Sequence, residues 1–239
     1  MLVLAGPARV GKTTIAKRVA EFAFNSGLRP CLMSFAGVLK KEAEAKGYAK
    51  EEDPDKYREF CQREGKEKRD EDPDYWIKKF HEEVLSVLAQ EKELINEDAQ
   101  FWEHIIIVDD CRYMNEVGYA KEHNATLVFV DNGHRMLPEQ DAEYRQHESE
   151  KLANKVSSGE KDYQDIFPWV IRNQGSMEAL EEKLRAVMPT WCNVSNKVHY
   201  ATCPCELCTA RRQDRFPDIE KLVDEILSEI FKEYEDDDE

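Results

Sequence analysis

The sequence predicts an α/β fold in which helices flank a doubly wound parallel sheet. Short apolar runs alternate along the chain with segments of helical periodicity, which is typical of strands joined by crossover helices. The runs at 104–108 and 126–130 are continuously apolar, as in parallel strands that are buried on both faces. A glycine-containing loop of the phosphate-binding type follows the first run. A Cys-rich segment and a further helix are appended at the C-terminus.

Each element is expected from its periodicity and its flanking residues. The expected strands cover 2–5, 29–35, 104–108, 126–130 and 169–171. The expected helices cover 14–26, 36–46, 54–64, 76–88, 114–123, 148–156, 176–187 and 217–231. Gly27, Gly47 and Gly65 follow three of these helices as stop signals, whereas Asp72-Pro73-Asp74 is a helix start.

Residues 6–13 read GPARVGKT and fit the phosphate-binding pattern G-x-x-x-x-G-K-[ST]. Backbone N–H groups and the positive end of the following helix would surround phosphate oxygens there. Lys12 would reach the β- and γ-phosphates of a nucleotide, and the Thr13 hydroxyl would ligate Mg²⁺. The expected nucleotide-binding residues are Gly6, Ala8, Arg9, Val10, Gly11, Lys12, Thr13 and Thr14.

Two acids, Asp109 and Asp110, directly follow the apolar run at 104–108 and are candidates for the Mg²⁺ site. We assign this role to Asp110; a helix cap or an ion pair with Arg112 is the alternative for one of the two acids. Phosphoryl transfer depends mainly on positioning and on well-placed cations, and arginine forks hold two phosphate oxygens at once. Arginines in segments that could face a nucleotide are Arg9, Arg63, Arg69, Arg112, Arg135 and Arg145.

A phosphate monoester is already ionised near neutral pH, so a kinase acting on one needs no general base. It does need to exclude water, since water would otherwise hydrolyse the donor. The polar segment 132–146 is suited to a lid over such a site. The expected catalytic residues are therefore cations and one acid: Lys12, Asp110, Arg112 and Arg135.

Composition narrows the classes of partner. The formal net charge of -16 argues against a nucleic-acid-binding surface. No apolar run approaches the roughly 20 residues of a membrane span, and no signal peptide precedes the first strand. We expect a cytoplasmic protein, in the host cytoplasm if the origin is a phage, with small-molecule nucleotides as partners and a homodimer left open.

The seven cysteines suggest reduced thiols or metal ligation, because a phosphate-binding loop implies a reducing compartment. Cys192, His199, Cys203, Cys205 and Cys208 could close a tetrahedral structural Zn²⁺ site. The alternative is a small packed appendage with unliganded thiols.

Six blocks occur in a fixed order along the chain. They are the loop at 6–14, SFAGVLK at 34–40, a Q-x-x-G…R…D-P-x-x-W stretch at 62–76, IVDDCRYMNE at 107–116, HESE at 147–150 and WVIRNQGS at 169–176. In combination these blocks resemble the bacteriophage-type deoxynucleoside monophosphate kinases, over about residues 1–188. The resemblance implies transfer of the ATP γ-phosphate to a deoxynucleoside monophosphate, giving the diphosphate, with Mg²⁺.

The resemblance also implies roles for single residues. Arg69 would contact the acceptor phosphate, and Asp110 and Arg112 would lie between the two nucleotides. The expected substrate-binding residues are Ser34, Gln62, Arg69, Trp76, Asp110 and Arg112. Glu116 and Glu150 could be structural clamps, which the sequence leaves open.

The chain departs from the family at a few positions. Cys111 replaces a small aliphatic residue, Phe167-Pro168 stands where an acid is expected, and residues 66–68 read KEK before Arg69. The domains expected are a P-loop kinase domain at 1–188, a Cys-rich appendage with an amphipathic helix at 189–232, and an acidic disordered tail at 233–239. The alternatives are a kinase of another small phosphorylated acceptor, such as phosphomevalonate, and a nucleotide-dependent binding protein that uses the appendage.

Overall fold

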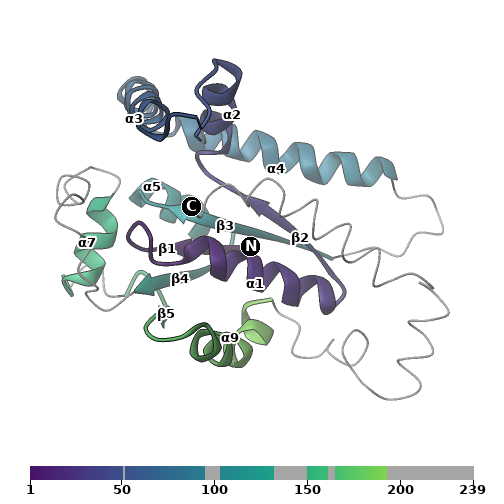
Figure 1. Ribbon diagram of the computed structural model, residues 1–239. Coiled ribbons are helices and arrows are strands. Elements are labelled where there is room, and N and C mark those ends of the chain that lie inside the picture. Colours follow the sequence, from purple (N-terminus) through teal and green to yellow (C-terminus); the bar gives the residue numbers. More distant parts are fainter. Residues whose placement is uncertain (51, 95–102, 132–149, 161–164, 193–239) are drawn as a thin grey trace.

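The computed structural model describes residues 1–50, 52–94, 103–131, 150–160 and 165–192 (Figure 1). Within these ranges five parallel strands form one sheet, in the order β2-β3-β1-β4-β5. The predicted parallel sheet is confirmed, with small differences at the strand ends. The strands are β1 Leu2–Ala5, β2 Leu28–Met33, β3 Glu103–Cys111, β4 Thr126–Asp131 and β5 Trp169–Arg172.

The helices described are α1 Lys12–Asn25, α2 Gly37–Ala45, α3 Pro54–Glu71, α4 Tyr75–Leu94, α5 Met114–Glu122, α7 Lys151–Ser157 and α9 Met177–Trp191. Helices α1 and α9 cover one face of the sheet, whereas α4 and α5 cover the other (Figure 1). Flanking helices on both faces explain why the central strands carry no polar face: all four residues of β1 are buried.

Strand β1 is central, because Leu2 lies opposite Ile107 of β3 and opposite Thr126 of β4. From β1 the chain goes to β2 at one edge and returns to β3, and β4 and β5 then continue on the other side. The strand order therefore reverses beside β1, and ligands of open α/β sheets bind at such a point, beyond the carboxyl ends of the strands.

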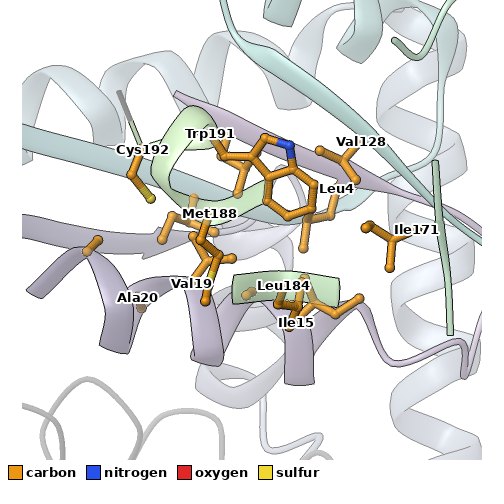
Figure 2. Close-up of a cluster of buried hydrophobic side chains, with 14 of the residues drawn as sticks. Leu4, Ile15, Val19, Ala20, Val128, Ile171, Leu184, Met188, Trp191 and Cys192 are labelled. Carbon is orange, nitrogen blue, oxygen red and sulfur yellow. The ribbon is translucent and has the colours of Figure 1, made fainter. Parts of the chain in front are cut away.

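The core on the α1–α9 face is built from alternate strand residues and the apolar stripes of the two helices. Leu4 and Val128 contribute from the sheet, and Ile15 and Leu184 contribute from the helices. Figure 2 shows these side chains pointing toward one another between the sheet and the two helices. This core fixes the direction of α1 and hence the place of the loop that precedes it.

One predicted boundary between helices is wrong. Helix α3 continues through Gly65 to Glu71, because Gly65 is buried in the helix interior rather than placed after its end. Helix α4 begins at Tyr75, directly after the predicted start at Asp72-Pro73-Asp74, and the Asp72 side chain accepts from the N–H of Asp74 at 3.1 Å as a cap does.

Helix α9 extends beyond the expected end at 187 and includes Pro189. Trp191 and Cys192 pack in the core with Leu4 and Val128, so the folded unit reaches past the domain boundary expected at 188 (Figure 2). The other residues expected in the appendage and in the acidic tail, from 193 to 239, lie outside the described residues. No helix in the described part of the chain combines the length and the apolar character needed to cross a membrane.

Candidate functional site

The phosphate loop, residues 6–11, connects β1 to α1 (Figure 1). Three of its residues have positive φ: Gly6 at 146°, Arg9 at 58° and Gly11 at 88°. A Cβ on Gly6 would lie 2.3 Å from the carbonyl oxygen of Val130 in β4. Backbone conformation and close approach therefore both require glycine at position 6.

Two side chains that are distant in sequence hold this loop. Asn173, which follows β5, donates from Nδ2 to the carbonyl of Val10 at 2.8 Å. Glu150, which precedes α7, accepts from the N–H of Ala8 at 3.1 Å. Sequence reasoning placed both residues in shared blocks but missed these contacts, because 163 and 142 residues separate the partners.

Lys12 begins α1 and folds back over the loop. Its Nζ donates to the carbonyls of Gly6, at 3.0 Å, and Pro7, at 2.7 Å. Burial lowers the pKa of Lys12 to about 8, with a further contribution from the positive charge of Arg112. The carboxylates of Glu150, Asp109 and Asp110 oppose this shift. A buried amine thus lies over the loop, bonded to two of its carbonyls.

Thr13 is paired with Asp109, the other of the two acids considered for the Mg²⁺ site, and not with Asp110. The Thr13 hydroxyl donates to Oδ2 of Asp109 at 2.6 Å. Strand β3 includes both acids, but its register on β1 shifts between Val108 and Cys111, so the Thr13 hydrogen bond and not strand alternation places Asp109. Asp109 therefore points toward α1. Burial and the neighbouring charge of Asp110 raise the pKa of Asp109, while Lys40 of α2 acts in the opposite direction.

Asp110 orders the turn between β2 and α2. Its carboxylate accepts from the N–H of Phe35 at 2.8 Å and from the N–H of Ala36 at 3.2 Å. The Ser34 hydroxyl also donates to Asp110, and Ser34 is buried. Ser34 and Asp110 were expected to bind substrate; in the structure they are hydrogen-bonded to each other and within this turn.

Arg112 is joined to the phosphate loop through Glu150. Its Nη1 donates to Oε1 of Glu150 at 2.5 Å, while the other oxygen of the same carboxylate holds Ala8. The backbone N–H of Arg112 donates to Glu116 at 2.6 Å, and the N–H of Tyr113 donates to the same oxygen at 3.0 Å. Both acids that the sequence left unassigned therefore hold Arg112 in place.

Arg69 lies beside Tyr113, the residue that follows Arg112. Its guanidinium is 4.2 Å from the centroid of the Tyr113 ring, and its Nη1 donates to the carbonyl of Gly65 at 2.8 Å. The positive charge of Arg69 also acts on Glu116. The contacts thus run from the loop through Glu150, Arg112 and Tyr113 to Arg69, which brings the two predicted arginines to the same part of the molecule.

Trp76 is buried, contrary to the expectation that it contacts a nucleoside. Its side chain packs with Leu39 and Phe60, and its Nε1 donates to the carbonyl of Gly65 at 3.2 Å. It therefore anchors α4 to α2 and α3. Gln62 is half-buried and shares the helix face of Gly65 and Arg69 by its spacing.

The other predicted residues are either described elsewhere on the molecule or lie outside the described residues. Arg63 is exposed and contacts Glu64 at 3.6 Å on the same helix. Arg135, Arg145 and the expected lid at 132–146 lie outside the described residues. So do His199, Cys203, Cys205 and Cys208 of the expected zinc site.

Cys192, the one expected zinc ligand that is described, does not fit that role. It is buried among apolar side chains, and burial raises the pKa of its thiol to about 12. Zinc binds the thiolate, which this environment disfavours. Among the residues that the structure describes, no three Cys, His, Asp or Glu side chains are grouped to hold a metal ion. The Thr13 hydroxyl and the Asp109 carboxylate form a pair of oxygen donors, the ligand type that Mg²⁺ prefers.

The site combines groups that are typical of anion recognition. A loop of backbone N–H groups at a helix start, a buried lysine and a fixed arginine are the components of phosphate recognition. No protein-family model matches the chain, and no curated protein matches it in sequence.

Proposed function

We propose that this protein is an ATP-dependent phosphotransferase that converts a deoxynucleoside monophosphate into the diphosphate. One observation carries the proposal: Lys12, the Thr13–Asp109 pair and Arg112 all adjoin one phosphate loop. The loop follows the central strand of a parallel sheet, at the point where the strand order reverses. This arrangement supports a doubly wound P-loop kinase fold, in which ATP phosphates lie at the start of α1.

In the proposed reaction the loop and Lys12 hold the β- and γ-phosphates. The ammonium of Lys12 would exchange its bonds to the carbonyls of Gly6 and Pro7 for phosphate oxygens. Arg112 would stabilise the negative charge on the equatorial oxygens of the transferred group. Its guanidinium is suited to this role because Glu116 and Glu150 hold its backbone and its side chain.

Thr13 and Asp109 would hold Mg²⁺ together with phosphate oxygens and water. When bound, the ion would neutralise charge on the phosphates. Asp110 keeps a different role in this proposal: it fixes the turn that leads into α2. The metal role moves from Asp110 to Asp109 for that reason.

The acceptor would lie toward Arg69. Arg69 contacts the ring of Tyr113, whereas Arg112 is bonded to Glu150 beside the loop. In this proposal Arg112 binds the transferred group and Arg69 binds the acceptor phosphate. The acceptor phosphate is ionised, and its oxygen would attack directly. No side chain in this proposal removes a proton from it.

An acceptor screen tests the proposal. The purified chain is incubated with ATP, Mg²⁺ and each of the four common deoxynucleoside monophosphates, and ADP formation is followed by a coupled assay. Phosphomevalonate and a reaction without acceptor complete the set. We expect turnover with at least one deoxynucleoside monophosphate, and Lys12→Ala should lower kcat by about 10²- to 10³-fold.

The matched control is Lys121→Ala, because Lys121 is exposed in the last turn of α5. It should leave turnover unchanged. Thermal unfolding of both variants establishes that the fold is intact. Full activity of Lys12→Ala, or turnover with none of the four nucleotides, would overturn the proposal.

A further inference from the structure

Glu150 is a buried carboxylate with a separate partner for each of its oxygens. Oε2 accepts from the backbone N–H of Ala8 at 3.1 Å, and Oε1 accepts from Nη1 of Arg112 at 2.5 Å. Its side chain is only 4% exposed. A buried charge in this position is tolerated only because both contacts are made, so the carboxylate fixes the distance between the loop and the arginine.

We propose that Glu150 is a positioning residue, which locks Arg112 against the phosphate loop so that its guanidinium and the Lys12 ammonium face the same phosphate group. This inference deepens the proposed function and depends on it for its effect on turnover. The hydrogen bond between Glu150 and Arg112 is observed whether or not the proposed function is correct.

Geometry supports a lock on Arg112 at both ends. Glu116 holds the backbone N–H of Arg112 at 2.6 Å, and Glu150 holds the guanidinium. An arginine side chain has many rotamers, and holding it in one of them removes an entropy cost from the later binding step. Glu150 therefore holds Arg112 in one side-chain conformation before phosphate binds.

The negative charge of Glu150 is a second reason to assign it a positioning role. Lys12 and Arg112 are close enough for the arginine to act on the lysine electrostatically, and Glu150 acts on the same lysine with the opposite sign. Two cations at one phosphate group repel each other, and a carboxylate bonded to one of them reduces that repulsion. Glu150 thus allows both cations to stay at the loop.

The alternative role for Glu150 is competition with phosphate, because its carboxylate is bonded to the N–H of Ala8 in the loop. The packing around Glu150 disfavours it. Helix α7 begins at the next residue, and its Leu152 and Ala153 are buried in the core against the sheet. Displacing Glu150 would leave a buried carboxylate without partners, which is costly.

The test uses Glu150→Gln, Glu150→Asp and Arg112→Ala, together with the double variant Glu150→Gln/Arg112→Ala. The glutamine keeps an acceptor for Ala8 but loses the charge, and the aspartate keeps the charge on a shorter side chain. Turnover with the best deoxynucleoside monophosphate gives kcat and the KM for ATP. Calorimetry with ATP and Mg²⁺ gives the Kd without any need for turnover.

We expect Glu150→Gln to lower kcat by up to about 10²-fold, with a much smaller change in the KM for ATP. Glu150→Asp should recover part of the loss. In the Arg112→Ala background Glu150→Gln should have little further effect, because its target is already gone. The control Glu160→Gln changes an exposed acid beyond α7 and should leave both constants unchanged.

Three results would overturn the inference: equal losses from Glu150→Gln with and without Arg112, an unchanged kcat, or a tighter ATP Kd, which indicates competition. If Glu150→Gln does not fold, Arg112→Lys replaces it, since lysine keeps the charge without the fork that Glu150 holds. Full kcat in that variant would count against the lock. If wild-type protein binds ATP but transfers phosphate to no acceptor, the proposed function fails, and the ATP Kd of Glu150→Gln still decides between the lock, which predicts an unchanged or weaker Kd, and competition, which predicts a tighter one.

Discussion

Replacing Glu116 by glutamine is expected to remove a pH-dependent loss of stability. Glu116 is 5% exposed, and one of its oxygens accepts from the N–H groups of Arg112 and Tyr113. Burial raises its pKa from 4.5 to about 7, and the nearby charge of Asp110 adds to this effect. The two backbone hydrogen bonds and the charge of Arg69 act in the opposite direction but do not cancel it.

The direction of the effect follows from the pKa. A carboxyl group with a raised pKa binds its proton more tightly in the folded chain than in the unfolded chain, so its ionisation favours unfolding. The free energy of unfolding therefore falls as the pH rises from about 4.5 to about 7, and the loss is complete above that range. At about 1.4 kcal/mol for each pH unit between these values, the loss is about 3 kcal/mol.

Urea denaturation at pH 5 and pH 8 measures this loss. The glutamine side chain can still accept from both N–H groups and does not titrate. Its free energy of unfolding relative to wild type should therefore rise by about 3 kcal/mol between the two pH values. Glu122→Gln is the control, because Glu122 is exposed at the end of the same helix, and its pH dependence should match that of wild type. Parallel pH profiles for wild type and Glu116→Gln would refute the reasoning.

Two further predictions concern the phosphate loop. Gly6→Ala would place a Cβ 2.3 Å from the Val130 carbonyl at a φ of 146°, and it should lower the free energy of unfolding by at least about 2 kcal/mol in urea. The control Gly27→Ala meets no atom within 4 Å and should cost only about 1 kcal/mol of strain; an equal loss in both would exclude the contact as the cause. Asn173→Ala removes the bond to Val10 and should weaken ATP binding by about fivefold in calorimetry. Asn154→Ala, at an exposed position of α7, should not change ATP binding, and an unchanged Kd for Asn173→Ala would contradict a role for this bond.

Local pattern predicted the strands and the loop because these depend on neighbouring residues. The runs before the loop and at 104–108 and 126–130 form β1, β3 and β4, and the glycines at 6 and 11 have the positive φ that the motif needs. Gly65 shows where the same reasoning fails. A glycine ends many helices, but here it lies inside α3, where a Cβ would lie 3.2 Å from Leu39 and Arg69 atoms.

Two site residues, Asp110 and Trp76, have surroundings that the sequence did not indicate, for the same physical reason. Asp109 and Asp110 are adjacent, and which of them faces α1 depends on the register of β3 on β1 at this point. The apolar run stops at 108, although pairing with β1 continues the strand to Cys111. Trp76 similarly fits a substrate contact or a core position, and only the packing of α2 and α3 against it decides.

The hydrogen bonds that hold the phosphate loop explain why its motif alone does not define the site. Ala8 is held from Glu150, Val10 from Asn173 and Thr13 is paired with Asp109, and each partner comes from a different part of the sheet's carboxyl edge. Because these partners are far apart in sequence, the loop takes its final form only after β3, β5 and the start of α7 have assembled around β1. Phosphate binding and completion of the sheet should therefore be coupled. A ligand of the loop should stabilise the whole folded unit, and loss of any one of these partners should weaken that stabilisation.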